Sequence, residues 1–311
     1  MTVFITGGAG FIGSNFIHYL VSKGWEDLVV IDKLTYAANL NNLHPLDVTV
    51  KQVDIKRLEK LEDLFVEFKP QFVFNFAAES HVDNSIKDVY PFIESNIIGT
   101  VNLLNLSLKY EVERFHHIST DEVYGSLNSF ESSFKESSQY SPRNPYSASK
   151  AASDHFVMAF HNTFGLNAVI TNCSNNYGPR QHYEKLIPKT ILNVMQNKKI
   201  PIYGKGANIR DWLYVEDHCK AIFDVFNRGK IGHKYNIGGN CEISNIELVR
   251  LIINLMNSNE GLIEYVDDRP GHDFRYSINN KKINLEIGWE PSYNIKNGLI
   301  KTINWYESVK N

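Results

Sequence analysis

The chain has 311 residues, of which 43% are hydrophobic and 22% are charged, and its formal net charge at pH 7 is -3. This composition is typical of a globular protein, and the length allows a sizeable core and two lobes. The small negative charge and the lack of a dense Lys/Arg run argue against a nucleic-acid-binding protein.

The cysteines and the N-terminus bear on metal content and location. Cys173, Cys219 and Cys241 are widely spaced and never form a CxxC pair, so we expect reduced thiols rather than disulfides or a zinc site. No His/Cys/Asp cluster has metal-ligand spacing, and we expect no metal. The first residues run straight into a predicted strand without a signal peptide, and no apolar run approaches the roughly 20 residues of a membrane span. The sequence therefore predicts a cytoplasmic protein.

The first half of the chain alternates between strand and helix patterns. Strands are predicted at 2–6, 28–32, 48–55, 72–77, 114–120 and 166–172. Helices are predicted at 14–24, 56–69, 91–110 and 145–165. This alternation predicts an α/β fold with a doubly wound parallel Rossmann sheet and helices on both faces.

After about residue 172 the pattern becomes irregular, with loops and short helices such as 245–256. We expect a dinucleotide-binding Rossmann domain at residues 1–172. A smaller, mixed α/β substrate lobe is expected at residues 173–311, with some segments interleaved with the first domain.

Polar and small residues follow the predicted strands. Thr6–Gly7, Asp32, Asp54, Ala77–Ser80 and Thr120–Glu122 all stand at strand carboxyl ends. Because parallel strands bring these ends to one edge of the sheet, where ligands bind, we expect the functional residues there.

The segment TGGAGFIG follows the first predicted strand and opens the first helix. Gly8, Gly10 and Gly13 fit the GxGxxG spacing, and Gly7, Gly10 and Gly13 fit the wider GxxGxxG spacing. Glycines allow a tight turn and a close approach of the backbone to a pyrophosphate at the helix N-terminus. A carboxylate at Asp32 would accept hydrogen bonds from a ribose 2′-hydroxyl, which favours NAD over NADP. The alternative is a structural glycine turn and a solvated aspartate.

Two further strand ends fit a cofactor. Asp54 and Ile55 lie where an adenine would meet the sheet edge, and the small Ala77 and Ala78 would let a cofactor pass close to the fourth strand. As alternatives, Asp54 caps the next helix and the alanines only pack.

The segment YSASK places Tyr146 and Lys150 on one face of a predicted helix. A neighbouring ammonium and a positive nicotinamide would both favour the phenolate of a tyrosine, so Tyr146 is a candidate base toward a sugar hydroxyl. Thr120 ends the fifth predicted strand at the same sheet edge and strengthens this interpretation.

These motifs carry a family resemblance. TGxxGxxG, a Thr at the end of the fifth strand and YxxxK resemble the extended short-chain dehydrogenase/reductases, which act on nucleotide sugars. Longer blocks between residue 2 and about residue 290 resemble the dTDP-glucose 4,6-dehydratase family: VVIDKLTYAANL, AAESHVDNSI, FHHISTDEVYG, NPYSASKAASDH, TNCSNNYGPRQHYEKLIPKTI, IYGKGANIRDWLYVEDHC, YNIGG and DRPGHDFRYSIN.

The resemblance implies a lyase that converts dTDP-glucose to a 4-keto-6-deoxy sugar and water. Tyr146 and Thr120 would act on the C4 hydroxyl, and NAD would take up hydride from C4 and return it to C6. Glu122 would remove the C5 proton while Asp121 protonates the leaving C6 hydroxyl. Neighbouring carboxylates push their pKa values apart, as these opposite duties require. The alternative is that Asp121 caps the next turn and Glu122 faces solvent.

Successive side chains of a straight strand point to opposite faces. For both acids to reach one sugar, we predict that the chain turns at residues 120–122.

The resemblance also implies two sets of contacts. The cofactor contacts would be Gly7, Gly10, Phe11, Ile12, Gly13, Asp32, Lys33, Leu34, Thr35, Asp54, Ile55, Phe76, Ala77, Ala78, Ser80, Ser95, Tyr146, Lys150 and Asn176. The substrate contacts would be Glu79, Ser80, Thr120, Asn175, Lys185, Leu186, Pro201, Ile202, Tyr203, Arg210, Asn245, Arg269 and His272. Arg and Lys suit the phosphates, and Tyr203 suits the base. As alternatives, Arg210 forms a surface ion pair and His272 is structural.

Several competing hypotheses about the function remain. A UDP- or GDP-sugar dehydratase and a sugar-nucleotide 4-epimerase share the fold, although an epimerase does not need the acids of the TDE triplet. A pseudoenzyme that senses NAD would be expected to lose Tyr146, Lys150 or an acid.

The family usually has Arg where this chain has Asn84, which puts affinity for NAD or phosphate in question. The resemblance implies a homodimer through the helices at 91–110 and 145–165. It leaves the product's destination, rhamnose or another deoxysugar, undetermined.

Overall fold

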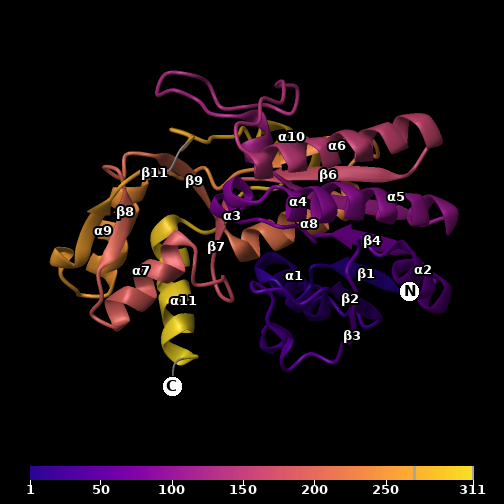
Figure 1. Cartoon of the computed structure of the whole chain (residues 1–311), viewed down its shortest axis with the longest axis horizontal. Helices are drawn as coiled ribbons and strands as arrows, with labels where there is room; N and C mark the ends of the chain where they lie inside the picture. The colour runs from indigo at the N-terminus through magenta and orange to yellow at the C-terminus, as the bar shows by residue number, and fades with distance from the viewer. Residues whose placement is uncertain (269–270, 310–311) are drawn as a thin grey trace.

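The computed structural model describes residues 1–268 and 271–309 (Figure 1). Within them, the main sheet has seven strands, all parallel, in the order β10-β6-β5-β4-β1-β2-β3. The strands are β1 Val3–Thr6, β2 Leu28–Asp32, β3 Thr49–Gln52, β4 Phe72–Asn75, β5 Arg114–Thr120, β6 Ala168–Cys173 and β10 Lys234–Ile237. The strand order reverses direction between β1 and β4, which is where ligands bind in such sheets. The predicted doubly wound α/β fold is confirmed.

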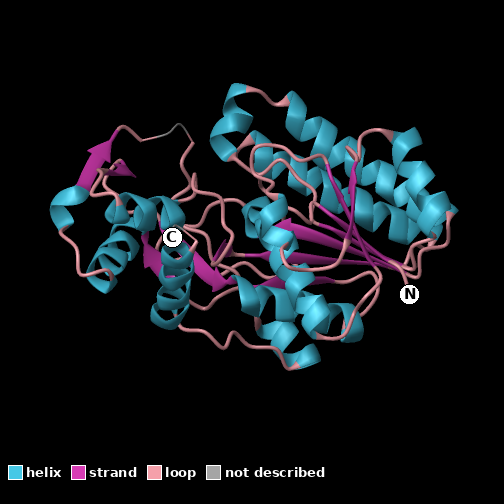
Figure 2. Cartoon of the chain, turned by 90° about the horizontal axis from the view of Figure 1, so that it is seen from below, coloured by secondary structure: helices cyan, strands magenta, loops and turns pink. Residues whose placement is uncertain are grey.

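Helices cover both faces of this sheet (Figure 2). Phe4 of β1 belongs to a buried cluster with Leu103, on the side of α2, α5 and α6. Its neighbour Ile5 belongs to a second cluster with Phe16, on the side of α1 and α8. Alternating side chains along a buried strand thus supply both cores. The helices are α1 Phe11–Ser22, α2 Leu58–Phe68, α5 Thr100–Lys109, α6 Pro145–Phe164 and α8 Val215–Arg228.

The helix predicted at 91–110 is not one regular α-helix. It begins as α4 Tyr90–Phe92, widens into the π-helix η2 Ile93–Gly99 and continues as α5. π-Helical turns are rare in proteins, but those that occur are often found at functional sites. Here the wide turn carries Asn96, whose side chain accepts from Glu79 N at 2.8 Å and donates to Glu79 O at 3.1 Å. The turn therefore fixes the loop that follows β4.

The later part of the chain also contributes to the main sheet. β10 pairs with β6 over four residues, beginning with Lys234 opposite Ile170, and α8 packs on the sheet beside α1. A division of the chain near residue 172 stays a prediction, because the sheet itself draws on segments from both sides of it.

The rest of the chain forms a smaller lobe beside the carboxyl ends of the strands, at the left of Figure 1. It contains two small sheets, β11-β9-β7 and β12-β8. Its core includes Ile191, Trp212, Leu248 and Leu299. The strands are β7 Asn175–Tyr177, β8 Ile200–Tyr203, β9 Ile209–Tyr214, β11 Glu242–Ser244 and β12 Ile263–Val266. The helices are α7 Leu186–Met195, α9 Asn245–Leu255 and α11 Ile295–Ser308.

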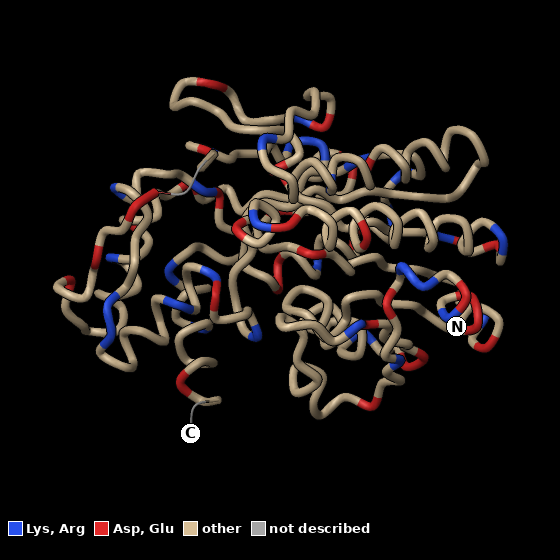
Figure 3. Tube along the Cα trace, viewed as in Figure 1, with Lys and Arg blue, Asp and Glu red and all other residues tan. Residues whose placement is uncertain are grey.

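The remaining short elements are connectors. They are η1 Leu40–Leu43, α3 Val82–Lys87, η3 Asp121–Tyr124, η4 Glu260–Leu262 and α10 Lys281–Ile287. In the part of the chain that the structure describes, no helix is both long enough and apolar enough to cross a membrane. Basic and acidic residues are interspersed over both lobes (Figure 3).

Candidate active site

The glycine-rich turn between β1 and α1 is shaped by close backbone contacts. Gly7 has a φ of +66°, a conformation that favours glycine. A Cβ atom on Gly13 would lie 2.4 Å from Gly7 O, so α1 can approach the turn only without a side chain there. The first amides of α1 therefore face the sheet edge beside Gly10, the N-cap residue. This arrangement fits a diphosphate, because the first amides of a helix have no intrahelical partner and its N-terminus is positive.

Asp32 ends β2 next to this turn. Its carboxylate accepts from Ala9 N at 3.1 Å and from Leu34 N at 2.8 Å, and burial raises its pKa. Each carboxylate oxygen has a further lone pair, so Asp32 can still accept from a ligand hydroxyl. The turn and Asp32 together fit a dinucleotide.

The chain turns where β5 ends, as predicted. The 3-10 helix η3 begins at Asp121, and the Thr120 side chain caps it by accepting from Glu122 N at 3.2 Å. Asp121 is buried and Glu122 is half-buried. The cap comes from Thr120, so Asp121 does not serve that role, and both acids line the same cavity.

The electrostatics separate Asp121 from an ordinary carboxylate. Burial raises the pKa of Asp121 well above its usual value, and the negative charges of Glu122 and Asp211 raise it further. These effects favour the protonated form of the carboxyl. Asp121 is therefore the candidate proton donor of the pair.

Tyr146 and Lys150 lie on α6 and line the same cavity as the acids. Burial and the charge of Glu122 raise the pKa of Tyr146 well above its usual value. The expected lowering by Lys150 is not seen, since burial dominates the pKa of Tyr146; the Lys150 amine donates to Ile118 O at 2.8 Å. Burial also lowers the pKa of Lys150. Tyr146 is therefore a neutral phenol in this structure.

A buried polar network that includes Asp154 and His117 lies next to Lys150. Asp154 accepts from Ser119 Oγ at 2.9 Å and from Tyr140 OH at 2.8 Å, and His117 Nε2 lies 3.4 Å from its other oxygen. Asn75 Nδ2 lies 3.1 Å from His117 Nδ1 and, as a donor, assigns the His117 proton to Nε2. The Asp154 charge raises the pKa of Lys150, which partly offsets its burial.

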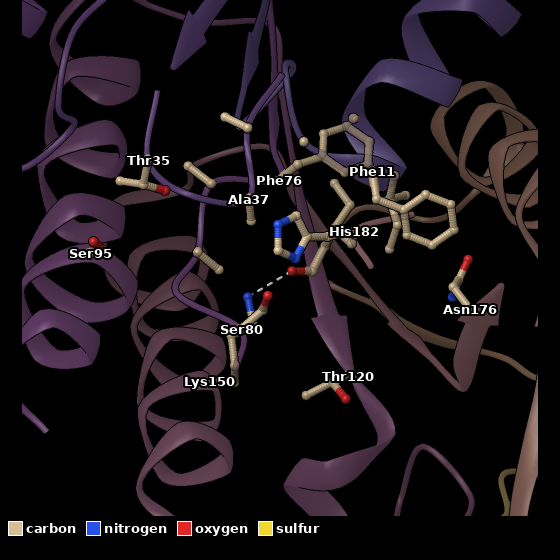
Figure 4. Close-up of a pocket in the computed structure, with 18 of the residues that line it drawn as sticks. Phe11, Thr35, Ala37, Phe76, Ser80, Ser95, Thr120, Lys150, Asn176 and His182 are labelled. Atoms are coloured by element: carbon tan, nitrogen blue, oxygen red, sulfur yellow. Dashed lines mark hydrogen bonds between the residues drawn. The ribbon is translucent and has the colours of Figure 1, made fainter. Parts of the chain in front are cut away.

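One cavity of about 300 Å³ joins the glycine turn to the residues that are expected to be catalytic. Figure 4 shows several of its side chains, including Phe11, Thr120 and His182. It is lined by these predicted residues: Gly7, Gly10, Phe11, Ile12, Gly13, Asp32, Lys33, Thr35, Asp54, Ile55, Phe76, Ala77, Ala78, Ser80, Ser95, Thr120, Asp121, Glu122, Tyr146, Lys150, Asn175, Asn176 and Lys185.

A second cavity continues from the first into the smaller lobe. The two share Ser80, Glu122, Asn175, Asn176 and Lys185 among their lining residues. The predicted residues Leu186, Pro201, Ile202, Tyr203, Arg210, Asn245 and His272 line the second cavity. Arg210 is buried and donates to Asp273 O at 3.0 Å, so it is not a surface ion pair.

A few predicted residues lie elsewhere. Leu34 and Glu79 line neither cavity. The Leu34 amide supports Asp32, and the Glu79 carboxylate pairs with Lys33 Nζ at 2.7 Å. Arg269 lies outside the described residues. Asp54 Oδ1 accepts from Lys56 N at 3.0 Å, so it stabilises the turn before α2 while also lining the first cavity.

Sequence reasoning missed several lining residues. Gln181, His182 and Glu184 line the first cavity, and Tyr276 lines the second. All four stand inside the blocks that carry the family resemblance. The signal was present in the sequence, but nothing in the local pattern distinguished these residues from their neighbours.

The fold and this site define an extended short-chain dehydrogenase/reductase. The family model described as GDP-mannose 4,6 dehydratase matches residues 4–302. A dTDP-glucose 4,6-dehydratase of Haemophilus influenzae is 46% identical, over 98% of this chain and 98% of that relative. The chain belongs to the dTDP-glucose 4,6-dehydratase family.

Solved structures agree with this assignment. A dTDP-glucose 4,6-dehydratase of Streptomyces venezuelae, solved with NAD and dTDP bound, gives a TM-score of 0.95 at 41% identity, covering 99% of this chain and 97% of that chain. A UDP-glucose 4-epimerase of Thermotoga maritima, solved with UDP-glucose, has the same TM-score at 27% identity, with both chains covered completely. Dehydratases and epimerases thus share the fold, and the sequence separates them.

Proposed function

We propose that this protein converts dTDP-glucose to dTDP-4-keto-6-deoxyglucose and water, with NAD as its cofactor. The observation that carries the proposal is the turn at Thr120–Glu122. It brings Asp121, whose pKa is raised well above its usual value, and a second acid, Glu122, into one cavity with Tyr146. A 4-epimerase removes no water and has no use for this pair of acids.

The cofactor would lie along the ends of β1, β2 and β4. The first amides of α1 and the turn at Gly7–Gly13 would hold its diphosphate, and Asp32 would accept from a ribose hydroxyl. When bound, NAD+ would take the hydride from C4, return it to C6 and, by its positive charge, favour the phenolate of Tyr146.

Tyr146 would lose its own proton when the positively charged cofactor is bound, and as a phenolate it would take the proton of the C4 hydroxyl, while Thr120 hydrogen-bonds the same oxygen. Tyr146 lies close enough to Thr120 for a side-chain hydrogen bond that acts to lower its pKa. Oxidation at C4 gives a ketone, which makes the C5 proton acidic.

The two acids then divide the elimination between them. Glu122 takes the proton from C5 while the C6–O bond breaks, and Asp121 gives its proton to the departing hydroxyl, which leaves as water. A hydride at C6 and a proton at C5 complete the 4-keto-6-deoxy sugar. Asp121 is assigned the role of acid because burial and neighbouring negative charges raise its pKa, and Glu122 is then left as the base.

The nucleotide end would occupy the second cavity. Arg210 and Lys185 would meet the diphosphate, and Tyr203 offers a half-exposed ring to the base. His272 Nδ1 lies 2.6 Å from Asp268 Oδ1, which orients its ring at the cavity wall. The product is a 4-keto sugar nucleotide, which reductases or transaminases of deoxysugar biosynthesis, including a rhamnose pathway, could use.

We also propose a cytoplasmic homodimer. The helices α5 and α6 pack side by side (Figure 1). Ile98 of η2, with Phe156 and Phe164 of α6, exposes a large apolar side chain. A contiguous apolar patch is typical of protein interfaces, and these side chains would contribute to one. Sedimentation of the purified protein tests this, and a monomer at micromolar concentration would refute it.

Mass spectrometry of dTDP-glucose after incubation with the purified protein tests the activity. We expect loss of one water, an unchanged nucleotide and no net reduced nicotinamide. Added NAD+ controls for weak retention of the cofactor, which Asn84 makes a specific concern. If the mass does not change while an epimer appears by NMR, the dehydratase proposal is wrong and the epimerase reading replaces it.

A further inference from the structure

A tyrosine from the smaller lobe reaches the base of the proposed reaction. Tyr276 is 3% exposed and lines the second cavity. Its hydroxyl lies 3.4 Å from Glu122 Oε2 and also donates to Asp273 Oδ2. Glu122 and Tyr276 are 154 residues apart in sequence, so this contact exists only in the folded protein.

The ring of Tyr276 is held firmly in place. The Arg210 guanidinium lies over it at 4.3 Å from the ring centre and also donates to Asp273 O and Phe274 O. The backbone of Tyr276 donates to Ile209 O at 3.2 Å, which fixes the segment against β9. A ring fixed on both sides presents its hydroxyl to Glu122 in a constant position.

A phenolic hydroxyl can donate one hydrogen bond and accept others. While Glu122 is a carboxylate, the Tyr276 proton can be shared with it. After Glu122 has taken a proton, the acid can donate to the Tyr276 oxygen while the Tyr276 proton remains with Asp273. Arg143 Nε, 3.4 Å from the other Asp273 oxygen, supports that carboxylate in both states. Burial raises the pKa of Tyr276 well above its usual value, so the hydroxyl keeps its proton throughout.

We propose that Tyr276 is a positioning residue for Glu122, whose hydroxyl orients the carboxylate toward C5 and remains a hydrogen-bond partner after the proton has moved. This inference rests on the proposed function, because it assigns Glu122 the C5 proton.

The placement also links the base to the nucleotide end. The segment that carries Tyr276 begins beside His272, and Arg210 stacks on the Tyr276 ring. Both His272 and Arg210 line the second cavity. A diphosphate bound at Arg210 would therefore contact the side chain that stacks on the Tyr276 ring. The hydroxyl of that ring is the group that orients Glu122.

The test is Tyr276→Phe, which keeps the ring and its packing against Arg210 and removes only the hydroxyl. We expect kcat to fall about ten- to a hundred-fold, as for a misplaced catalytic group, with little change in KM. Exchange of the C5 proton with deuterated solvent should slow, and reduced nicotinamide should accumulate during turnover. Tyr124→Phe is the matched control, because Tyr124 is also buried and near the acids but donates to Asn236, at 2.9 Å.

A double-mutant cycle with Glu122→Gln separates positioning from structural support of Asp273. If Tyr276 acts through Glu122, Tyr276→Phe should cost little further activity in the Glu122→Gln background. The same loss in both backgrounds would overturn the inference, and so would a parental kcat in the single variant.

Fluorotyrosine at position 276 provides a second variant in case Tyr276→Phe does not fold. It keeps the ring and hydroxyl while making the hydroxyl more acidic, so the pH profile of kcat should shift at constant KM. An unshifted profile would contradict the inference. If the unaltered protein binds dTDP-glucose and NAD but removes no water, the proposed function itself fails, and that outcome is visible before any variant is made.

Discussion

The two halves of the cavity are built from different kinds of structure. The strand-end half contains Gly7, Gly13 and Asp32, which come from consecutive turns at the ends of β1 and β2. The lobe half contains Lys185 and Arg210, which come from separate segments of the smaller lobe. Backbone geometry shapes the first half, whereas side-chain charge dominates the second.

This difference has a practical meaning. In the strand-end half, binding and folding depend on the same close contacts, so a substitution there should damage both. In the lobe half, the charge of the partly exposed Lys185 can be removed while the backbone stays in place, so affinity should change with little loss of stability. The acids at Asp121 and Glu122 stand between the halves and should affect chemistry alone.

The largest effect is expected for Asp121→Asn, which removes the proton donor but keeps the shape of the side chain. We expect kcat to fall about 10²- to 10⁴-fold, the usual contribution of a general acid, with dTDP-glucose binding retained. Turnover assays measure kcat, and equilibrium binding measures the affinity for dTDP-glucose. Asp217→Asn is the control, because Asp217 is equally buried but bonds to Ser292 and Tyr293 away from either cavity. Near-normal turnover in Asp121→Asn would remove its assigned role.

The second prediction tests the coupling of folding and binding in the strand-end half. Gly13→Ala places a Cβ atom 2.4 Å from Gly7 O, so the turn must move. We expect a loss of about 1–3 kcal/mol in unfolding free energy, together with loss of NAD retention. Gly261→Ala is the control, since its nearest neighbour is a side-chain oxygen of Asn259 at 3.2 Å. Normal stability with normal NAD retention in Gly13→Ala would break the comparison.

The third prediction concerns pH and the buried histidines of the main sheet and α8. Burial lowers the pKa of His117 to about 4 and that of His218 to about 3. Both pKa values lie below the unfolded value of about 6.5. The unfolded chain therefore binds these protons first, and their stabilisation is present above pH 6.5 and lost as the pH falls toward 4.

Urea unfolding between pH 7 and pH 4.5 measures this effect. We expect the unfolding free energy to fall by up to about 1.4 kcal/mol per pH unit for each histidine. His218→Gln should weaken the dependence, whereas His155→Gln, at an exposed position, should leave it unchanged. If the unfolding free energy depends on pH in the same way in both variants, His218 does not contribute to that dependence.

The smallest effect is expected for Lys185→Met in the lobe half. Lys185 Nζ lies 3.2 Å from Ser80 O at the junction of the two cavities. Loss of one partly exposed phosphate contact should weaken dTDP-glucose binding about three- to ten-fold, with unchanged unfolding and NAD retention. Lys199→Met, whose amine bonds to Gly261 O outside both cavities, is the control. A large loss of stability in Lys185→Met would contradict the proposed difference between the two halves of the cavity.

The features that sequence reasoning predicted are local ones. The doubly wound sheet followed from alternating strand and helix periods, and the turn after Thr120 followed from the geometry of a strand that must present two adjacent acids. The features that it missed are not local. The π-helix at Ile93–Gly99 and the direction of the Lys150 amine depend on partners from distant segments.

The residues alone predicted the order of the strands and helices along the chain, the glycine turn and the residue types expected to be catalytic. Each depends on side-chain periodicity or on backbone constraints within a few residues. Folding is what raises the pKa values of Tyr146 and Asp121 and what brings Tyr276 to Glu122. These properties arise from burial and from charges brought together by folding, and no local stretch of sequence contains them.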